Sequence, residues 1–188
     1  MTAIGNTDPN DVSEWYNEVH VFNRLNPSEP LIGLVQGRTT LFPIAGLAKR
    51  EVNTGHPDWA RYSNALTFDL ELHLPGSGGS GPVSSHDIYC VDLDPITYEP
   101  TSALNLTAHL DDNEGAQMAD AAPSWLPGDA GIVFERDGSL AQLRFVANYA
   151  PGSGCPTAAN LAATAELLAT SKGKGNRGRH LQEPDYLQ

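Results

Sequence analysis

Carboxylates are the side chains of this sequence best suited to chemistry. Asp92 and Asp94 flank Leu93 at the end of a β-rich run, and Glu71 or Glu135 could act as a more distant partner. Two carboxyl groups about 5–10 Å apart can hydrolyse a glycosidic bond, one as the acid and the other as base or nucleophile. Sequence spacing alone brings no two of them together, so a small carboxylate-dependent hydrolase is kept as an alternative function.

Neither the histidines nor the second acidic cluster forms a ligand pattern. None of the six histidines belongs to an HExxH or similar pair, and His73 and His109 fall on the polar face of alternating runs, where we expect solvated side chains. The stretch Asp111-Asp112-Asn113-Glu114-Gly115 lacks the alternating ligands and closing Glu of a calcium loop, so we expect a solvated acidic loop. The sequence predicts no catalytic residue, no metal and no cofactor.

Two cysteines, Cys90 and Cys155, are the candidates for covalent cross-linking. They permit one disulfide, two free thiols or links to neighbouring chains. Their spacing fits no CxxC motif, which argues against zinc or redox chemistry.

The charge of the chain is strongly uneven. There are 11 Lys+Arg against 23 Asp+Glu, for a net charge of −12. Four of the basic residues lie in one glycine-rich stretch without acids, which leaves −16 on the rest: Lys172, Lys174, Arg177 and Arg179. We expect 172–188 to be a flexible basic tail that contacts an anionic surface, with a merely solvated end as the alternative.

The composition resembles that of proteins from extreme halophiles. Lysine occurs three times and isoleucine six times, whereas alanine occurs 21 times. Carboxylates keep a protein hydrated in salt, and small apolar side chains moderate a hydrophobic effect that salt strengthens. An acidic protein from a GC-rich mesophile is the alternative.

Alternating hydrophobicity predicts a β-protein. Over 65–74, five apolar residues share one face, and the intervening residues form a face that we expect to be wet: Leu66, Phe68, Leu70, Leu72 and Leu74. Further strands are expected at 19–25, 31–36, 39–44, 89–93, 104–110, 131–135 and 140–149, with Asp137-Gly138 as a hairpin turn. The segment 45–64 reads as irregular, and Pro75–Pro82 as a natural Gly/Ser loop or an engineered linker.

Eight short strands without βαβ alternation predict a single eight-stranded jelly-roll β-barrel. One domain would span 1–171. Thr157 can cap a short C-terminal helix over about 157–171, with Leu161, Ala165 and Leu168 as its apolar stripe. We see no signal peptide and no apolar run that would cross a membrane.

In whole-chain character, the sequence resembles the small major capsid proteins of haloarchaeal, membrane-containing icosahedral viruses of the sphaerolipovirus type. The likeness lies in size, acid-rich and lysine-poor composition, about eight strands and the lack of a catalytic constellation. It implies a non-enzymatic virion protein that is assembled in the host cytoplasm. Its partners would be a larger major capsid protein and copies of itself over an internal lipid membrane, without specific nucleic-acid binding.

Two expectations accompany this resemblance. In an extracellular particle, Cys90 and Cys155 should be oxidised, either to each other or across subunits. The rival to the capsid role, besides the hydrolase, is a jelly-roll carbohydrate-binding module with Trp15, Trp59 or Trp125 at its ligand face.

The charge of the chain makes a testable prediction about salt. The thermal midpoint at pH 7 should rise between roughly 0.1 and 2 M NaCl, because the Debye length falls from about 10 Å at 0.1 M to about 3 Å at 1 M and relieves self-repulsion. Scanning calorimetry over this range measures the trend. A flat or falling midpoint would remove the halophile argument.

Overall fold

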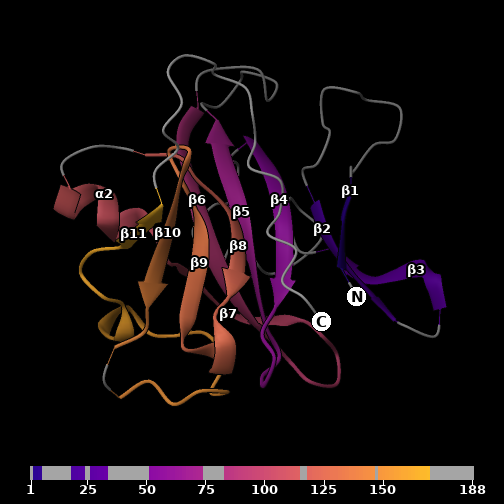
Figure 1. The fold of residues 1–188 in the computed structure, drawn as a ribbon. Coiled ribbons are helices and arrows are strands. Elements are labelled where there is room, and N and C mark those ends of the chain that lie inside the picture. The colour runs from indigo at the N-terminus through magenta and orange to yellow at the C-terminus, as the bar shows by residue number, and fades with distance from the viewer. Residues whose placement is uncertain are drawn as a thin grey trace.

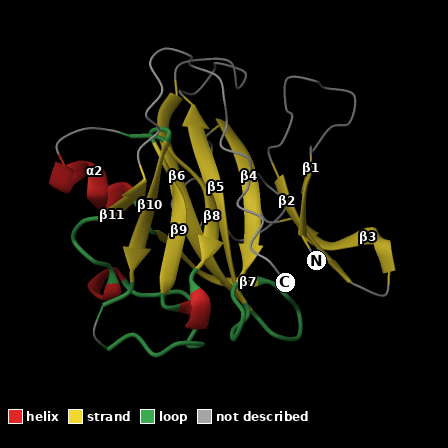
Figure 2. Cartoon of the chain, viewed as in Figure 1, coloured by secondary structure: helices red, strands yellow, loops and turns green. Residues whose placement is uncertain are grey.

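The computed structural model describes residues 2–5, 18–23, 26–33, 51–73, 83–114, 118–146 and 148–169. Within these ranges the protein is mostly β-strand, with one short α-helix and two 3-10 turns (Figures 1 and 2). The strands form three antiparallel sheets, two of four strands and one of three.

The first four-stranded sheet is a meander of consecutive strands. Its order is β4 (Glu51–Trp59), β5 (Ala65–His73), β6 (Val83–Leu93) and β7 (Pro100–Asn105). The long central pair, β5 and β6, sets the register by placing Phe68 opposite Tyr89. The alternating run at 65–74 is therefore a strand, as the sequence predicts.

The second four-stranded sheet is also a meander. Its order is β11 (Glu166–Ala169), β10 (Ser139–Arg144), β9 (Gly131–Arg136) and β8 (Asp120–Trp125). The predicted hairpin is confirmed, because Arg136 pairs with Ser139 across a turn in which Asp137 and Gly138 have φ of 46° and 75°. Strand β10 ends at Arg144, short of the predicted Tyr149.

The third sheet lies beside β4 and contains β1 (Thr2–Gly5), β2 (Glu18–Asn23) and β3 (Asn26–Gly33). Strands β2 and β3 overlap the predicted strands at 19–25 and 31–36, while the predicted strand at 39–44 lies outside the described residues. The helical pieces are α2 (Ala108–Glu114), η2 (Pro127–Asp129) and η3 (Ala158–Asn160).

The two four-stranded sheets pack face to face around an apolar core. Ala65, Ile88 and Cys90 of the first sheet meet Ile132 and Phe134 of the second in this core. Across the first sheet, Leu66, Phe68 and Leu70 form a second buried cluster on the opposite face, joined by the partly buried Leu72; Leu74 lies outside the described residues.

The prediction that one face of β5 is wet is wrong. Ala65, Thr67 and Asp69 are 0%, 0% and 4% exposed, because this face turns toward β8, β9 and β10. Period-two alternation shows that a strand has two chemically different faces. It does not show that the polar face meets water, since polar groups with internal partners can be buried.

The all-β class is confirmed, in the form of a β-sandwich. The described strands make two separate four-stranded sheets and no closed barrel. Four of the described strands were not anticipated by the alternation pattern, namely β1, β4, β8 and β11. Gly55 and Pro57 interrupt β4, and Pro123 interrupts β8; a bulge lies at each interruption.

The predicted C-terminal helix at 157–171 is wrong. Thr157 does cap a turn, but that turn is the three-residue η3, closed by a reciprocal capping box with Asn160. The chain then extends, Leu161 bridges to Phe145, and β11 adds to the edge of β10. Hydrogen-bonding groups at the free edge of β10 thus outweigh the helix propensity of an Ala/Leu-rich segment.

The predicted strand at 104–110 is also wrong in its second half. Strand β7 ends at Asn105, whose side-chain oxygen accepts hydrogen bonds from the N–H groups of Thr107 and Ala108 at 3.0 and 2.9 Å. This Asx-type turn directs the chain into α2. Leu106 and Leu110 both remain fully buried, so a strand-like alternation of leucines serves a turn and a helix instead.

Cys90 and Cys155 form a disulfide within one chain. Cys90 lies on β6 inside the sandwich, and Cys155 lies in the loop before η3. The two are 65 positions apart along the chain, and their Cα atoms are 5.8 Å apart. Asp92 fixes the same loop, because its carboxylate accepts hydrogen bonds from the Cys155 N–H at 2.7 Å and the Ser102 hydroxyl at 2.8 Å. The segment that leads to β11 is therefore fastened to the first sheet.

Replacing both cysteines by alanine should lower the free energy of unfolding by about 4 kcal/mol, because a closed loop of this length restricts the unfolded chain. Urea denaturation of the wild type and the variant measures the difference. Reducing the wild type with a thiol serves as the matched control and should reproduce most of the loss. Equal midpoints for all three samples would contradict the prediction.

Candidate functional site

Polar residues gather where β8 meets β4 and β5. Strand β8 is an edge of its sheet, so some of its N–H groups face away from β9. Carboxylates of the other sheet accept their hydrogen bonds: Asp69 from the Ala122 N–H and Asp58 from the Trp125 N–H, each at 2.9 Å. A third carboxylate, that of the fully buried Asp129, accepts hydrogen bonds from the N–H groups of Arg61 and Tyr62.

Asp69 is the centre of a histidine cluster that we treat as the candidate site. Its Oδ2 atom lies 2.6 Å from Nδ1 of His56 on β4, and its Oδ1 atom lies 3.6 Å from Nε2 of His86 on β6. The carboxylate is nearly buried, while the His56 side chain is 42% exposed and that of His86 is 22% exposed. The cluster thus has a buried carboxylate at its centre and two histidines that are in contact with solvent.

The local backbone is shaped to admit this cluster. A Cβ atom on Gly55 would lie 2.5 Å from Oδ1 of Asp69, so a side chain at position 55 would displace the carboxylate. His56 and Ala122 have φ of 45° and 50°, and each sits in a bulge of its own strand. Positive φ at residues other than glycine is uncommon and costs about 1–3 kcal/mol, and bulges commonly redirect a side chain.

The partners of Asp69 keep it ionised despite burial. Burial alone would raise its pKa, but hydrogen bonds from His56, His86 and the Ala122 N–H hold the pKa well below its ordinary range. Burial pulls the pKa of His86 down, and the neighbouring carboxylate of Asp69, helped by Glu71 and Asp120, raises it overall. Below pH 6.5 the cluster is therefore an aspartate with the protonated His86 beside it.

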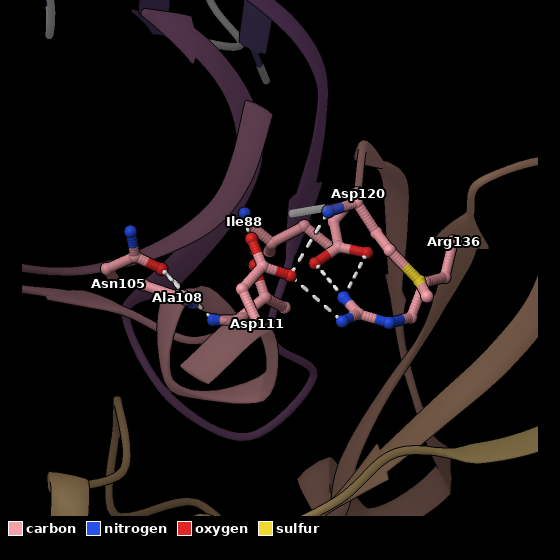
Figure 3. Close-up of polar contacts among 8 residues, drawn as sticks. Ile88, Asn105, Ala108, Asp111, Asp120 and Arg136 are labelled. Atoms are coloured by element: carbon pink, nitrogen blue, oxygen red, sulfur yellow. Dashed lines mark hydrogen bonds and ion pairs between the residues drawn. The ribbon is translucent and has the colours of Figure 1, made fainter. Parts of the chain in front are cut away.

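Figure 3 shows a buried ion network around Arg136, and one of its members, Asp120, acts electrostatically on His86 of the cluster. The Nη1 atom of Arg136 lies 2.7 and 2.6 Å from the two carboxylate oxygens of Asp120, and Nη2 lies 3.0 Å from Oδ1 of Asp111 on α2. Arg136 is 2% exposed and Asp120 is fully buried. One guanidinium thus links two strands of the second sheet to the helix that follows the first.

Two carboxylates share this one cation, which leaves a net negative charge in a buried place. Burial raises the pKa of Asp120 to about 7, and Asp111 adds to this effect while Arg136 and Thr107 oppose it. Burial likewise raises the pKa of Asp87, the neighbour of His86, against hydrogen bonds from Asn105 and Ser85. This end of the sandwich therefore responds to protons near neutral pH.

The arrangement supports proton-dependent stability. Within the described residues, no three His, Cys, Asp or Glu side chains converge as a metal site. The carboxylate of Asp69 already accepts hydrogen bonds from the opposite sheet, and the Arg136 network satisfies its members internally. The contacts of Asp58, Asp69 and Arg136 each join one element of the fold to another.

The carboxylates suggested for hydrolysis do not come together. Asp92 pairs with Ala65 at one end of β5, whereas Glu71 lies six residues further along that strand, about 20 Å away at 3.4 Å per residue. That separation is well beyond the range for paired catalytic carboxylates. Asp94 closes an exposed turn by accepting hydrogen bonds from the N–H groups of Ile96 and Thr97, and Glu135 belongs to the other sheet.

Two expectations about polar side chains are corrected. His109 is not a solvated strand residue: it lies on α2, 2.8 Å from the Ala162 carbonyl oxygen through Nε2. Asp111 is not a solvated loop residue, because Arg136 binds it. The side chain of His73 is not described.

The tryptophans suggested for ligand binding pack against the cores where the structure describes them. Trp59 packs on the Leu66 and Phe68 cluster, and Trp125 makes an edge contact with Phe145 at 5.9 Å. Trp15 and the basic residues Lys172, Lys174, Arg177 and Arg179 lie outside the described residues. Across the described segments, no helix has the length and apolar character to cross a membrane.

Sequence reasoning missed the members of the candidate site. His56, Asp69 and His86 are 13 and 17 positions apart along the chain, which matches no local motif. The one available indication was Asp69 itself, an acid in the middle of a strongly apolar strand. Comparison with protein family models, with curated proteins and with solved structures finds no match to this chain.

The site makes stability depend on pH in a defined window. The folded pKa of Asp69 is lowered from about 3.8, so its contribution is full above that value and is lost as pH falls. The folded pKa of His86 is raised from 6.5, so its contribution is full below 6.5 and is lost as pH rises through the folded value. Both contributions are present together between about pH 4 and 6.5.

Asp69→Asn should therefore cost about 2 kcal/mol of unfolding free energy at pH 5–6, because a neutral amide replaces the buried carboxylate that accepts hydrogen bonds from His56 and the Ala122 N–H. The loss should shrink toward pH 3, and again as pH rises above 6.5 through the folded pKa of His86. Urea denaturation from pH 3 to 8 measures it. Asp137→Asn, the same change at an exposed residue of a hairpin turn, is the control and should run parallel to the wild type. A parallel profile for Asp69→Asn would contradict the assignment.

Proposed function

We propose that this chain is a structural protein of an extracellular shell, with the role of a small major capsid protein over an internal membrane in high salt. The observation that carries the proposal is a disulfide-fastened, acidic β-sandwich with an open, leucine-bearing edge strand. Sandwiches of this kind expose strand edges through which subunits can join.

Several features support a structural role over a catalytic one. The described carboxylates and histidines make contacts between elements of the fold, and the candidate hydrolytic pair is about 20 Å apart. The disulfide suits a particle outside the cell, where reducing thiols are scarce. Assembly in the host cytoplasm would then precede closure of the disulfide.

The proposal does not depend on a jelly roll. Both four-stranded sheets run in consecutive strand order, whereas a jelly roll interleaves its strands between two sheets. A capsid role needs a rigid sandwich with accessible edges, and this requirement holds for either topology. Its partners would be a larger capsid protein and further copies of the chain.

The basic tail at 172–188 gives the proposal its membrane contact. Lys172, Lys174, Arg177 and Arg179 would hold the shell to anionic headgroups, each contributing about 1 kcal/mol at low salt. Molar salt screens this attraction, so contacts between subunits must supply the remaining adhesion.

Assembly in salt is the direct test. The purified chain, alone and with any partner from its native particle, should form large species in 2 M NaCl by sedimentation and electron microscopy. Deleting 172–188 should leave the sandwich folded but weaken flotation with anionic vesicles and lower particle yield. Monomers at every salt concentration, with or without the partner, would contradict the proposal.

A charge-matched pair of variants isolates the tail. Lys172→Gln with Lys174→Gln should lower vesicle affinity roughly 30-fold at low salt, from two charges at about 1 kcal/mol each. The double variant Arg61→Gln, Arg144→Gln removes the same charge from exposed positions of the sandwich. It should change the vesicle affinity little. Equal effects of the two pairs would show that the tail acts only through net charge.

A further inference from the structure

The two edges of the second sheet are finished in different ways. At one edge, Asp58 and Asp69 accept hydrogen bonds from the outward N–H groups of β8. At the other edge, β11 pairs with β10, and no described strand pairs with its far side. An edge strand without such protection is a template for another strand.

The side chains of β11 favour a partner over water. All four residues are exposed, and the two leucines, which alternate between the faces of the strand, are 58% and 46% exposed at Leu167 and Leu168. The first sheet shows the contrast: its edge strand β7 begins with Pro100 and exposes Thr101 and Ser102. Proline and polar residues discourage pairing at an edge, and β11 has neither proline nor lysine.

Strand β11 carries little charge, so a second copy of this acidic chain can approach it. Its one ionisable residue, Glu166, accepts a hydrogen bond at 2.5 Å from the Nε2 atom of Gln142 on the neighbouring strand. A chain with a net charge of −12 repels its copies over most of its surface, so contact is least opposed at an edge that carries little charge. Salt should strengthen such a contact by screening the rest.

We propose that β11 pairs antiparallel with β11 of a second copy, about a two-fold axis through Leu167. In an antiparallel pair, directly opposite residues point to the same face of the sheet. A two-fold axis also keeps each residue and its twin on one face, so the axis must pass between one residue and its own twin. Centring on Leu167 places it against its twin and sets Glu166 opposite Leu168 of the second copy. The second sheets of the two copies would become one continuous eight-stranded sheet, and the two Glu166 side chains would not face each other.

This inference rests on the proposed function, because the β11 pair would be one of the contacts between copies in the shell. A second copy is the occupant because the one carboxylate of the edge, Glu166, is already engaged by Gln142 and does not face its twin in this register. Residues 165–169 pair with themselves in reverse, Ala with Ala, Glu with Leu and Leu with Leu.

A cysteine at the two-fold axis tests the register in the full chain. Leu167→Cys should form a covalent dimer under mild oxidation in 2 M NaCl, with the linked peptide identified by mass spectrometry. Leu168→Cys, two positions off its own twin in this register, should cross-link at least about tenfold less. Ile96→Cys, at an 85% exposed position away from β11, is the control for random collision. Equal cross-linking at all three positions would overturn the proposal.

A charge at the same position tests the association itself. Leu167→Lys places two lysines against each other and should raise the dimer dissociation constant at least about tenfold, measured by analytical ultracentrifugation in 0.2 and 2 M NaCl. Ile96→Lys should leave it unchanged, and circular dichroism checks that both variants fold. Unchanged dimers of Leu167→Lys, or an edge occupied solely in the presence of a different protein, would overturn the proposal.

The outcomes separate this inference from the proposed function. Shells that form in salt without Leu167→Cys cross-links would leave the capsid role standing and place the contact between copies elsewhere. Cross-linked dimers that never grow into larger species would uphold the β11 contact and reject the shell.

Discussion

The sandwich depends on carboxylates that satisfy backbone groups across the gap between its sheets. An edge strand presents N–H groups that are costly to bury without acceptors. Strand β8 is such an edge, and Asp58 and Asp69 of the first sheet supply the acceptors. Asp129 does the same for the turn between β4 and β5. Because these bonds fix β8 against β4 and β5, they also fix the position of the histidines around Asp69.

Acidic residues therefore have two separate roles in this chain. Asp69, Asp87, Asp120 and Asp129 are buried and engaged inside the fold. Their effect on stability follows pH through the partners they find, and it is only weakly sensitive to salt. Exposed carboxylates such as those of Glu99 and Asp137 are instead open to screening by salt. A change of pH thus tests the buried aspartates, whereas a change of salt tests the exposed carboxylates. The halophile argument applies to the exposed carboxylates alone.

The same sheet is closed at β8 and open at β11, and this asymmetry connects the fold to its proposed role. The disulfide and the contacts of Asp92 fasten the loop around Cys155 to the first sheet. That fastening brings the chain to η3 and then to the free edge of β10, where β11 forms. The hydrogen bonds of Asp92, and the disulfide once it has closed, thus hold in place the edge through which we propose that copies associate.

By itself, the sequence determined the all-β class, the strand at 65–73 and the Asp137-Gly138 hairpin, because alternation and turn chemistry act over a few neighbouring residues. Tertiary structure decided the rest. The Ala/Leu-rich segment after Thr157 became a turn and a strand because β10 offered it an edge, a contact that propensity cannot anticipate. Asp69, His56 and His86 met because two strand pairings and a glycine placed them together. Their spacing along the chain does not predict this contact, since the pairing register is set by the packing of whole strands.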